Sequence, residues 1–328
     1  MKITISDIAK LAGVSKSTVS RYLNAGYVSI DAKSKIEQVI QETGYEPNKF
    51  AQNLKSKTSN FIGVIIPRLD SYAVAKTLIG IDEKLKENNY QMIISNTSQS
   101  IDREIESLYS FKKQKVAGII LLSTEITEKH QEAIDDIGIP IIVMGQEHYK
   151  YNCIVHDDFN AAYELTKYVI SMGHKNIAYL GVPEKDISVG IKRKAGFTKA
   201  IKEANILNIS YHTTNFAIED ALTTANTIIK KERPSLIFCA TDNIALGTMK
   251  SIFLNGLKIP KDISVVGFGG YKISEIIHPS LTTVKFDYHG AGNTASNNII
   301  KLIQGKNIDR VLVSNYEIIK RETVDKLL

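Results

Sequence analysis

The sequence lacks the features that mark membrane-spanning, exported and disulfide-rich proteins. No apolar run approaches the roughly 18 residues of a transmembrane helix, and the segment from Met1 to Asp7 contains no hydrophobic signal region. The two cysteines, Cys153 and Cys239, form no Cys-x-x-Cys pair and no disulfide framework, which suits a reducing compartment. With only 7 prolines, 43% hydrophobic and 23% charged residues, the composition is that of an ordinary globular protein. We therefore expect a folded cytoplasmic protein that does not bind a membrane.

The excess positive charge is concentrated at the N-terminal end of the chain. Residues 1–60 contain nine lysines and arginines against five acidic residues, whereas the remaining residues contain 32 against 30. At 328 residues the chain is long enough for two or three domains. A basic segment attached to a nearly neutral body indicates a polyanion, such as nucleic acid, as the partner of that segment.

The basic segment has a helical pattern interrupted by short turns. Helices are expected over 6–12, 16–23 and about 31–43, with Gly13 and Gly44 as stop signals. Ser15 is the expected N-cap of the second helix. The residues expected to face inward are Ile8, Leu11, Ala12, Val19, Tyr22, Leu23, Ile36, Val39 and Ile40. Two short helices joined by a glycine-containing turn fit a helix-turn-helix, although a small helical cap domain would have the same spacing.

Beyond residue 60, short apolar runs alternate with amphipathic helical patterns. Strands are expected at 61–67, 91–96, 118–123, 139–145, 176–182, 235–241 and 263–269. Helices are expected near 74–88, 101–115, 127–136, 159–172, 191–204, 219–231 and 243–254. Near-continuous apolar strands separated by helices predict an α/β fold with parallel sheets covered on both faces. The number of units favours two similar lobes, with a ligand cleft at the carboxyl ends of the strands.

The segment from Ile5 to Asn24 resembles the N-terminal signature of the lactose-repressor/galactose-repressor family of bacterial regulators. Further stretches match along the chain, and they are Pro47-Asn-x-x-Ala51-x-x-Leu54, Arg193-x-x-Gly196-Phe197, Ala240-Thr-Asp-Asn-Ile-Ala-Leu-Gly247, Asp262-Ile-Ser-Val-Val-Gly-Phe268 and Pro279-Ser-Leu-Thr-Thr-Val284. The resemblance implies a homodimeric, DNA-binding transcriptional repressor that responds to a sugar. It also implies an all-α helix-turn-helix domain (1–46), a hinge (47–60) and a periplasmic-binding-protein-like effector-binding and dimerisation domain (61–328). The lobes of that domain would be about 61–157 with 288–314, and about 158–287 with 315–328.

The resemblance assigns DNA-contacting roles to residues of the basic segment. Lys16 and Ser17 take the positions that face bases in the major groove, and Arg21 would reach bases or phosphate. The positions expected to face phosphate are Ser6, Ser15, Thr18, Ser20 and Asn24. Leu54 matches the leucine that enters the minor groove at the operator centre and kinks the duplex, with Lys55 beside it near phosphate. An ordinary hinge-to-core contact is the alternative for Leu54.

Effector-binding roles follow in the same way. Arg193 matches the arginine that grips the sugar, and its guanidinium can hold two hydroxyls at once. The other candidate lining residues are Arg68, Asp70, Ser71, Tyr72, Phe216 and Asp242, with Gln146, Thr241, Phe286, Asp287 and Tyr288 in second rank. Asp242 could accept sugar hydroxyls, but capping the helix that starts near Asn243 is the safer assignment. For Tyr72 and Phe216, stacking on a sugar ring and plain core packing are equally good readings.

Two departures from the family pattern bear on the ligand. Glycines stand at Gly145 and Gly269, where many relatives carry sugar-binding aspartates, and Arg68 follows the first strand of the body. Fewer carboxylates and an added cation favour an anionic sugar, and the pattern is most similar to sucrose- and trehalose-operon repressors. We therefore expect sucrose 6-phosphate or trehalose 6-phosphate to release the repressor from its operator. A neutral sugar or a purine is the alternative ligand.

The sequence contains none of the common catalytic motifs. It has no His-Glu-x-x-His, no Gly-x-Ser-x-Gly and no Gly-x-x-x-x-Gly-Lys loop, so we expect neither an enzyme nor a bound cofactor or metal. The adjacent His156, Asp157 and Asp158 are better explained by a strand-to-helix turn than by a metal site. A sugar-processing enzyme with Asp242 as its base is the remote alternative.

Overall fold

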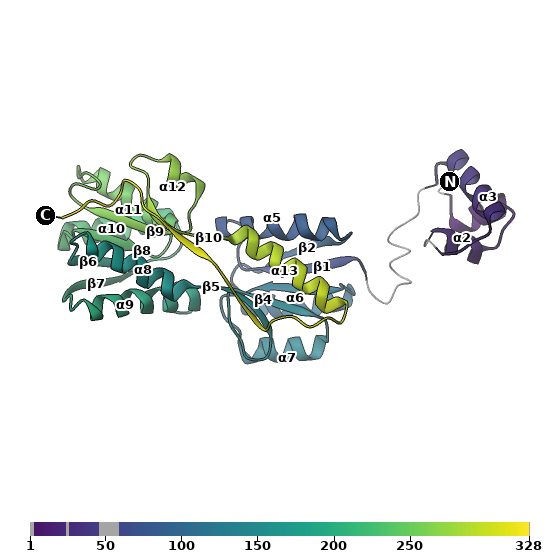
Figure 1. Ribbon diagram of the computed structural model, residues 1–328, viewed down its shortest axis with the longest axis horizontal. Coiled ribbons are helices and arrows are strands. Elements are labelled where there is room, and N and C mark those ends of the chain that lie inside the picture. The colour runs from purple at the N-terminus through teal and green to yellow at the C-terminus, as the bar shows by residue number, and fades with distance from the viewer. Residues whose placement is uncertain (1–2, 24–25, 46–58, 328) are drawn as a thin grey trace. The chain divides into compact units, whose positions relative to one another are not determined.

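The computed structural model describes residues 3–23, 26–45 and 59–327, which fall into two compact units, Met1–Ser59 and Asn60–Leu328 (Figure 1). The smaller unit is helical, and the larger one contains two β-sheets with helices on their faces. The predictions for Asn24, Leu54 and Lys55, and nearly all of the predicted hinge, lie outside the described residues.

The described part of the smaller unit consists of α1 (Ile5–Leu11), α2 (Lys16–Leu23) and α3 (Ile30–Thr43). The hydroxyl of Ser15 accepts the backbone N–H of Thr18 at 3.1 Å, which confirms Ser15 as the N-cap of α2. Gly13 and Gly44 follow α1 and α3 with φ values of +64° and +60°, a left-handed conformation that favours glycine. The local stop and start signals in the sequence therefore set the ends of these helices.

One apolar cluster holds the three helices together. Ile8, Val19 and Ile36 are fully buried in it. The prediction for Leu11 is wrong, because Leu11 is 61% exposed. The inward face of α1 also includes Ala9, so it is centred between Ile8 and Ala9, and Leu11 lies roughly 100° away around the helix.

Each half of the larger unit is built on a six-stranded sheet. The first sheet has the order β11-β5-β4-β3-β1-β2 and the second the order β12-β10-β9-β8-β6-β7. All neighbours are parallel except β10 and β12. The predicted parallel α/β architecture is therefore confirmed. We call the half with the first sheet the first lobe and the half with the second sheet the second lobe.

The first lobe comprises β1 (Phe61–Ile66), α5 (Tyr72–Glu87), β2 (Gln91–Asn96), α6 (Ile101–Lys113), β3 (Gly118–Leu122), α7 (Glu128–Ile137), β4 (Ile141–Met144), β5 (Asn152–His156), α13 (Tyr288–Ile303) and β11 (Val311–Ser314). The second lobe comprises α8 (Asp158–Ser171), β6 (Asn176–Gly181), the π-helical turn η1 (Ile187–Lys192), α9 (Arg193–Glu203), β7 (Asn208–Thr213), α10 (Ile218–Glu232), β8 (Leu236–Cys239), α11 (Asp242–Leu254), β9 (Ser264–Phe268), α12 (Lys272–Ile276), β10 (Thr282–Phe286) and β12 (Tyr316–Ile319). The strands β5, β7, β10, β11 and β12 and the helices α12 and α13 are additions to the elements expected from the sequence.

The chain crosses between the lobes three times. The crossings run from β5 to α8, from β10 to α13 and from β11 to β12, and Figure 1 shows the last two passing between the sheets. Because the strands of each sheet are largely parallel, their carboxyl ends and the loops that follow them gather at one edge of the sheet. In the residues described, no helix combines the length and the apolar character needed to span a bilayer.

Candidate functional site

The exposed face of α2 is basic and polar. Lys16, Ser17 and Arg21 are exposed on it, whereas Val19 is fully buried. The hydroxyl of Ser15 lies 2.7 Å from that of Ser17 and 2.8 Å from that of Thr18, so a hydroxyl cluster marks the start of this helix. No acidic residue occurs between Lys16 and Leu23, so the exposed face suits the phosphate-lined groove of a duplex.

A cleft lies between the two lobes of the larger unit. It encloses about 180 Å³ and is lined by loops that follow strands of both sheets. The candidate effector residues that line it are Arg68, Ser71, Gln146, Arg193, Phe216 and Thr241. Of the other four, Asp70 is exposed beside Arg68, Tyr72 and Phe286 line a neighbouring pocket, and Asp242 is buried behind the cleft. The sequence-based candidates are thus largely brought together, although they come from loops far apart in the chain.

Arg68 faces the second lobe from the first. Its guanidinium carbon lies 4.5 Å from the centre of the Phe216 ring, a cation–π contact across the cleft. Its Nε lies 3.6 Å from a carboxylate oxygen of Asp70, and 25% of its side chain is exposed. The contact holds the guanidinium beside the Phe216 ring while part of the side chain stays exposed to solvent.

Arg193 is buried and held from two sides. Its Nε donates to Asp158 at 2.8 Å, and its Nη1 donates to the carbonyl of Ala240 at 2.6 Å. Its guanidinium carbon also lies 4.9 Å from the ring centre of Phe268 and 5.4 Å from that of Phe286. Burial is the largest single effect and disfavours the charge, but Asp158, Tyr288 and Asp186 together outweigh it and keep the pKa of Arg193 above its ordinary value. These hydrogen bonds engage Nε and one N–H of Nη1, and the other N–H groups of the guanidinium are the ones that could donate to a ligand.

The prediction that Asp242 caps α11 is wrong. Thr241 is the N-cap, because it has extended backbone geometry and its hydroxyl accepts the N–H of Ile244 at 3.3 Å. The Asp242 carboxylate is fully buried and accepts from the Tyr271 N–H at 2.8 Å, from Ser274 at 2.8 Å and from Thr283 at 2.6 Å. With both oxygens engaged, Asp242 joins α11 to β10 and α12, and it is not placed to act as a base or to bind a sugar.

Two carboxylates missed by the sequence analysis line the cleft. Asp158 pairs with Arg193, and Asp186 begins η1 by accepting the N–H of Val189 at 2.9 Å. Burial raises the pKa of Asp186. The expectation of a carboxylate-poor cleft, based on Gly145 and Gly269, is therefore corrected, since acidic groups enter from the second lobe instead.

His156 was also missed as a cleft residue. It ends β5, and its Nδ1 is buried without a hydrogen-bond partner among the described residues. Its ring centre lies 4.9 Å from that of Phe286 and 5.0 Å from that of Tyr288. Burial lowers its pKa. The next residue, Asp157, caps α8 by accepting the Asn160 N–H at 3.2 Å, which confirms the predicted strand-to-helix turn.

Hydrogen bonds also join the lobes across the cleft. Ser188, in η1, donates its hydroxyl to the carbonyl of Gly145 at 2.8 Å, and the Gln146 amide reaches Ser188 at 3.5 Å. A π-helical turn beside a cleft is a common functional arrangement, because it re-aims side chains that a regular helix would direct elsewhere. Here the turn leads directly into Arg193 and brings Ser188 to the opposite lobe.

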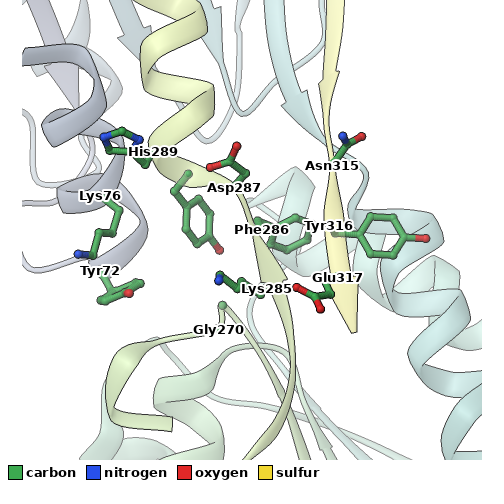
Figure 2. Close-up of a pocket in the computed structure, with 12 residues that line it drawn as sticks. Tyr72, Lys76, Gly270, Lys285, Phe286, Asp287, His289, Asn315, Tyr316 and Glu317 are labelled. Atoms are coloured by element: carbon green, nitrogen blue, oxygen red, sulfur yellow. The ribbon is translucent and has the colours of Figure 1, made fainter. Parts of the chain in front are cut away.

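A second pocket, which we call the hinge pocket, lies where the crossing segments leave β10 and enter β12. It encloses about 450 Å³, and its walls include Tyr72, Lys76, Gly270, Lys285, Asn315 and Glu317 (Figure 2). Lys76 and Tyr72 come from α5 of the first lobe, and Lys285 comes from β10 of the second. Tyr288 borders both this pocket and the cleft.

The fold and these surfaces define a DNA-binding transcriptional regulator with a small-molecule cleft. Residues 4–48 match the model of the bacterial regulatory proteins of the lacI family, and residues 59–322 match the periplasmic binding proteins and sugar binding domain of the LacI family. The chain belongs to the LacI family of transcriptional repressors.

Known proteins resemble the chain over nearly its whole length. It is 37% identical to the sucrose operon repressor of Staphylococcus xylosus over 316 residues, covering 95% of this chain and 98% of that protein. It is 32% identical to the HTH-type transcriptional repressor PurR of Vibrio campbellii over 333 residues, 99% of each chain. Its structure matches that of the lac repressor dimer bound to operator and the anti-inducer ONPF, with a TM-score of 0.92, 25% identity, and coverage of 99% of this chain and 100% of that one.

Proposed function

We propose that this chain represses a sugar-utilisation operon and is released from its operator by a phosphorylated disaccharide, of the sucrose 6-phosphate or trehalose 6-phosphate class. The observation that carries the proposal is Arg68, a cation that lines the cleft and contacts the Phe216 ring of the opposite lobe. The similarity to a protein named as a sucrose operon repressor supports the choice of sugar.

The surroundings of Arg68 suit a phosphate group. A phosphate dianion needs a cation and several donors, and a guanidinium offers two parallel N–H groups along one edge. Ser71, Gln99 and Thr124 line the same side of the cleft and can add hydroxyl and amide donors. Asp70 competes for Arg68 from the solvent side, at 3.6 Å.

The sugar would be held mainly by the second lobe. The remaining N–H groups of Arg193 can donate to ring hydroxyls, and Asp186 can accept from them. A ligand that contacts Arg68 in one lobe and Arg193 in the other favours one orientation of the lobes. That difference in binding between orientations is what would couple the cleft to operator affinity.

On the DNA side, we infer that Lys16 and Ser17 read base edges and that Arg21 contacts bases or phosphate. All three are exposed on one helix whose other side is packed into the core. Ser6, Ser15, Thr18 and Ser20 would face phosphates and orient the helix without selecting sequence. Binding-site selection with Lys16→Ala and Ser17→Ala variants tests this, and an unchanged consensus sequence would refute it.

The ligand proposal is tested by isothermal titration calorimetry with sucrose, trehalose, their 6-phosphates and a purine base. We expect the phosphorylated sugar to bind at least about tenfold more tightly, a difference of about 1.4 kcal/mol. Arg68→Ala should remove most of that preference. Asp70→Asn, its matched neighbour, should preserve or strengthen it because a competing carboxylate is lost. Equal affinity for a sugar and its phosphate would refute the proposal, and tight binding of the purine alone would favour the alternative ligand.

The release step is tested by operator binding measured as fluorescence anisotropy. Saturating sugar phosphate should weaken operator affinity of the wild type and have little effect on Arg68→Ala at the same concentration. Tighter operator binding with ligand would make the sugar phosphate a co-repressor and contradict the proposed direction of regulation.

A further inference from the structure

The cleft is small for the ligand class proposed above. It encloses about 180 Å³, whereas pockets that hold drug-sized ligands enclose roughly 300–1,000 Å³. A phosphate and one sugar ring are about half of a phosphorylated disaccharide. The second ring therefore needs space outside the cleft.

The hinge pocket offers such space directly beside the cleft. It encloses about 450 Å³, so that the two cavities together fall within the range for drug-sized ligands. Its walls combine the aromatic ring of Tyr72 with hydrogen-bonding groups on Lys285, Asn315 and Glu317 (Figure 2). Flat apolar faces beside donors and acceptors suit a sugar ring, which has an apolar face and a rim of hydroxyls.

A pair of aromatic rings lies between the two cavities, next to Tyr288, which borders both. Tyr72 lines the hinge pocket, Tyr271 lines the cleft, and their ring centres lie 4.4 Å apart. Tyr72 begins α5 in the first lobe, and Tyr271 precedes α12 in the second, so the pair is also a contact between lobes. Gly269 leaves room for the Tyr271 ring, because a side chain at position 269 would collide with it.

We propose that the Tyr72–Tyr271 pair is a gate and that the second ring of the disaccharide occupies the hinge pocket. The inference rests on the proposed function and assigns the two ends of its ligand. The phosphorylated ring sits in the cleft between Arg68 and Arg193. The other ring passes between the separated tyrosines and contacts Lys285 and Asn315.

The gate explains how ligand length could be converted into a response. A one-ring phosphate fits in the cleft and leaves the tyrosine pair closed. A two-ring phosphate must part the rings, and because they belong to different lobes, this displaces one lobe against the other. A ligand shifts only those equilibria whose states it distinguishes, so the long ligand releases the operator and the short one does not.

The test compares sucrose 6-phosphate and trehalose 6-phosphate with glucose 6-phosphate, by calorimetry and operator anisotropy on the full chain. Asn315→Trp fills the hinge pocket, and Lys285→Ala removes a hydrogen-bonding group from its wall without adding bulk. Asn307→Trp places the same ring on an exposed residue of a different groove and is the matched control. Near- and far-ultraviolet circular dichroism checks that each variant is folded.

We expect Asn315→Trp to weaken binding of the two-ring phosphate at least about tenfold, Lys285→Ala to weaken it to a smaller extent, and glucose 6-phosphate to bind all variants equally. In the wild type, only the two-ring phosphate should release the operator. If both hinge-pocket variants bind the two-ring phosphate like the wild type while Arg68→Ala does not, the gate is refuted and the proposed function stands. If neither sugar phosphate binds the wild type, the proposed function fails and the gate with it.

Discussion

Arg193 keeps a full positive charge in a buried site because its neighbours compensate that charge. Asp158 supplies the opposite charge at 2.8 Å, and both side chains are less than a tenth exposed. Such a pair adds little net stability, but breaking it leaves an uncompensated charge in the interior. Asp158 therefore serves two purposes, since it keeps Arg193 both charged and correctly aimed at the cleft.

We predict that Asp158→Asn lowers the free energy of unfolding by about 3–5 kcal/mol. The change preserves the shape of the side chain and removes only its charge. Urea denaturation followed by circular dichroism measures the effect. Glu184→Gln is the control, because it breaks the exposed ion pair of Glu184 with Lys194 and should change stability far less. Equal effects of the two variants would show that Asp158 is not needed to compensate a buried charge.

His156 makes stability depend on pH. Burial lowers the pKa of its imidazole from the ordinary value of 6.5, with Asp158 acting in the opposite direction. Since the unfolded chain binds the proton more readily than the folded one, stability is greatest above about pH 6.5 and falls as the pH drops through the folded-state pKa. We predict that His156→Gln unfolds with a smaller loss of stability between pH 8 and pH 5 than the wild type. The exposed His278→Gln variant should retain the wild-type profile, and an identical profile for His156→Gln would contradict the assignment.

Local sequence signals gave correct answers for some residues and wrong ones for others. Ser15 and Gly13 were predicted correctly because a cap depends on partners within a few residues. Asp242 was not, because its partners Tyr271, Ser274 and Thr283 lie far along the chain and no local pattern announces them. For the same reason Arg68 could be named from its position after a strand, whereas its stacking on Phe216 could not.

Among the elements, α13 shows why sequence analysis can fail to predict a helix. The segment 288–303 contains two glycines and several asparagines, residues with low helix propensity. The structure gives the reason for the glycine at 292, since a side chain there would collide with the carbonyl of Thr77 in α5. Gly80 of α5 is equally close to the backbone of His289. The two helices thus pack with their backbones in close contact. The glycines that allow this contact lower the helix propensity of the segment.

We predict that Gly292→Ala destabilises the protein by about 1–3 kcal/mol, because the added methyl group must push α5 and α13 apart. In an isolated helix the same substitution would stabilise by about 1 kcal/mol, so the sign of the change reports the packing. The measurement is the urea midpoint at constant m-value. Ser110→Ala, on the exposed surface of α6, is the control and should change stability little. A more stable Gly292→Ala variant would disprove the close contact.

The edge strand β7 was missed for a different reason. The strand β7 lies at the edge of its sheet and reads Asn-Ile-Ser-Tyr-His-Thr, a half-exposed pattern without the apolar run typical of a central parallel strand. By contrast, β8 and β9 are buried along their whole length and were found. An edge strand with a mixed pattern such as β7 is therefore harder to predict from sequence than a fully buried central strand such as β8 or β9.

At the scale of the whole molecule, each chain offers a single DNA-reading helix, α2, which is too small to select an operator alone. A dimer with two such helices should require a near-palindromic site. We predict that replacing one of the two half-sites in an operator duplex weakens binding by about 10³-fold or more, towards non-specific affinity. Anisotropy titrations at a single fixed salt concentration measure this, because the phosphate contribution depends strongly on salt. Equal affinity for operators with one and with two intact half-sites would show that the two α2 helices of a dimer do not both contact the operator.

The last strands of the molecule also have a consequence for its synthesis. The strand β11 completes the edge of the first sheet and β12 that of the second, and a single residue, Asn315, separates them. Until residues 311–319 have emerged from the ribosome, β5 and β10 each lack a neighbouring strand on one side. Such edges are templates for association between nascent chains. Both sheets are therefore completed by the same nine residues, 311–319, so that the two walls of the cleft are finished almost simultaneously.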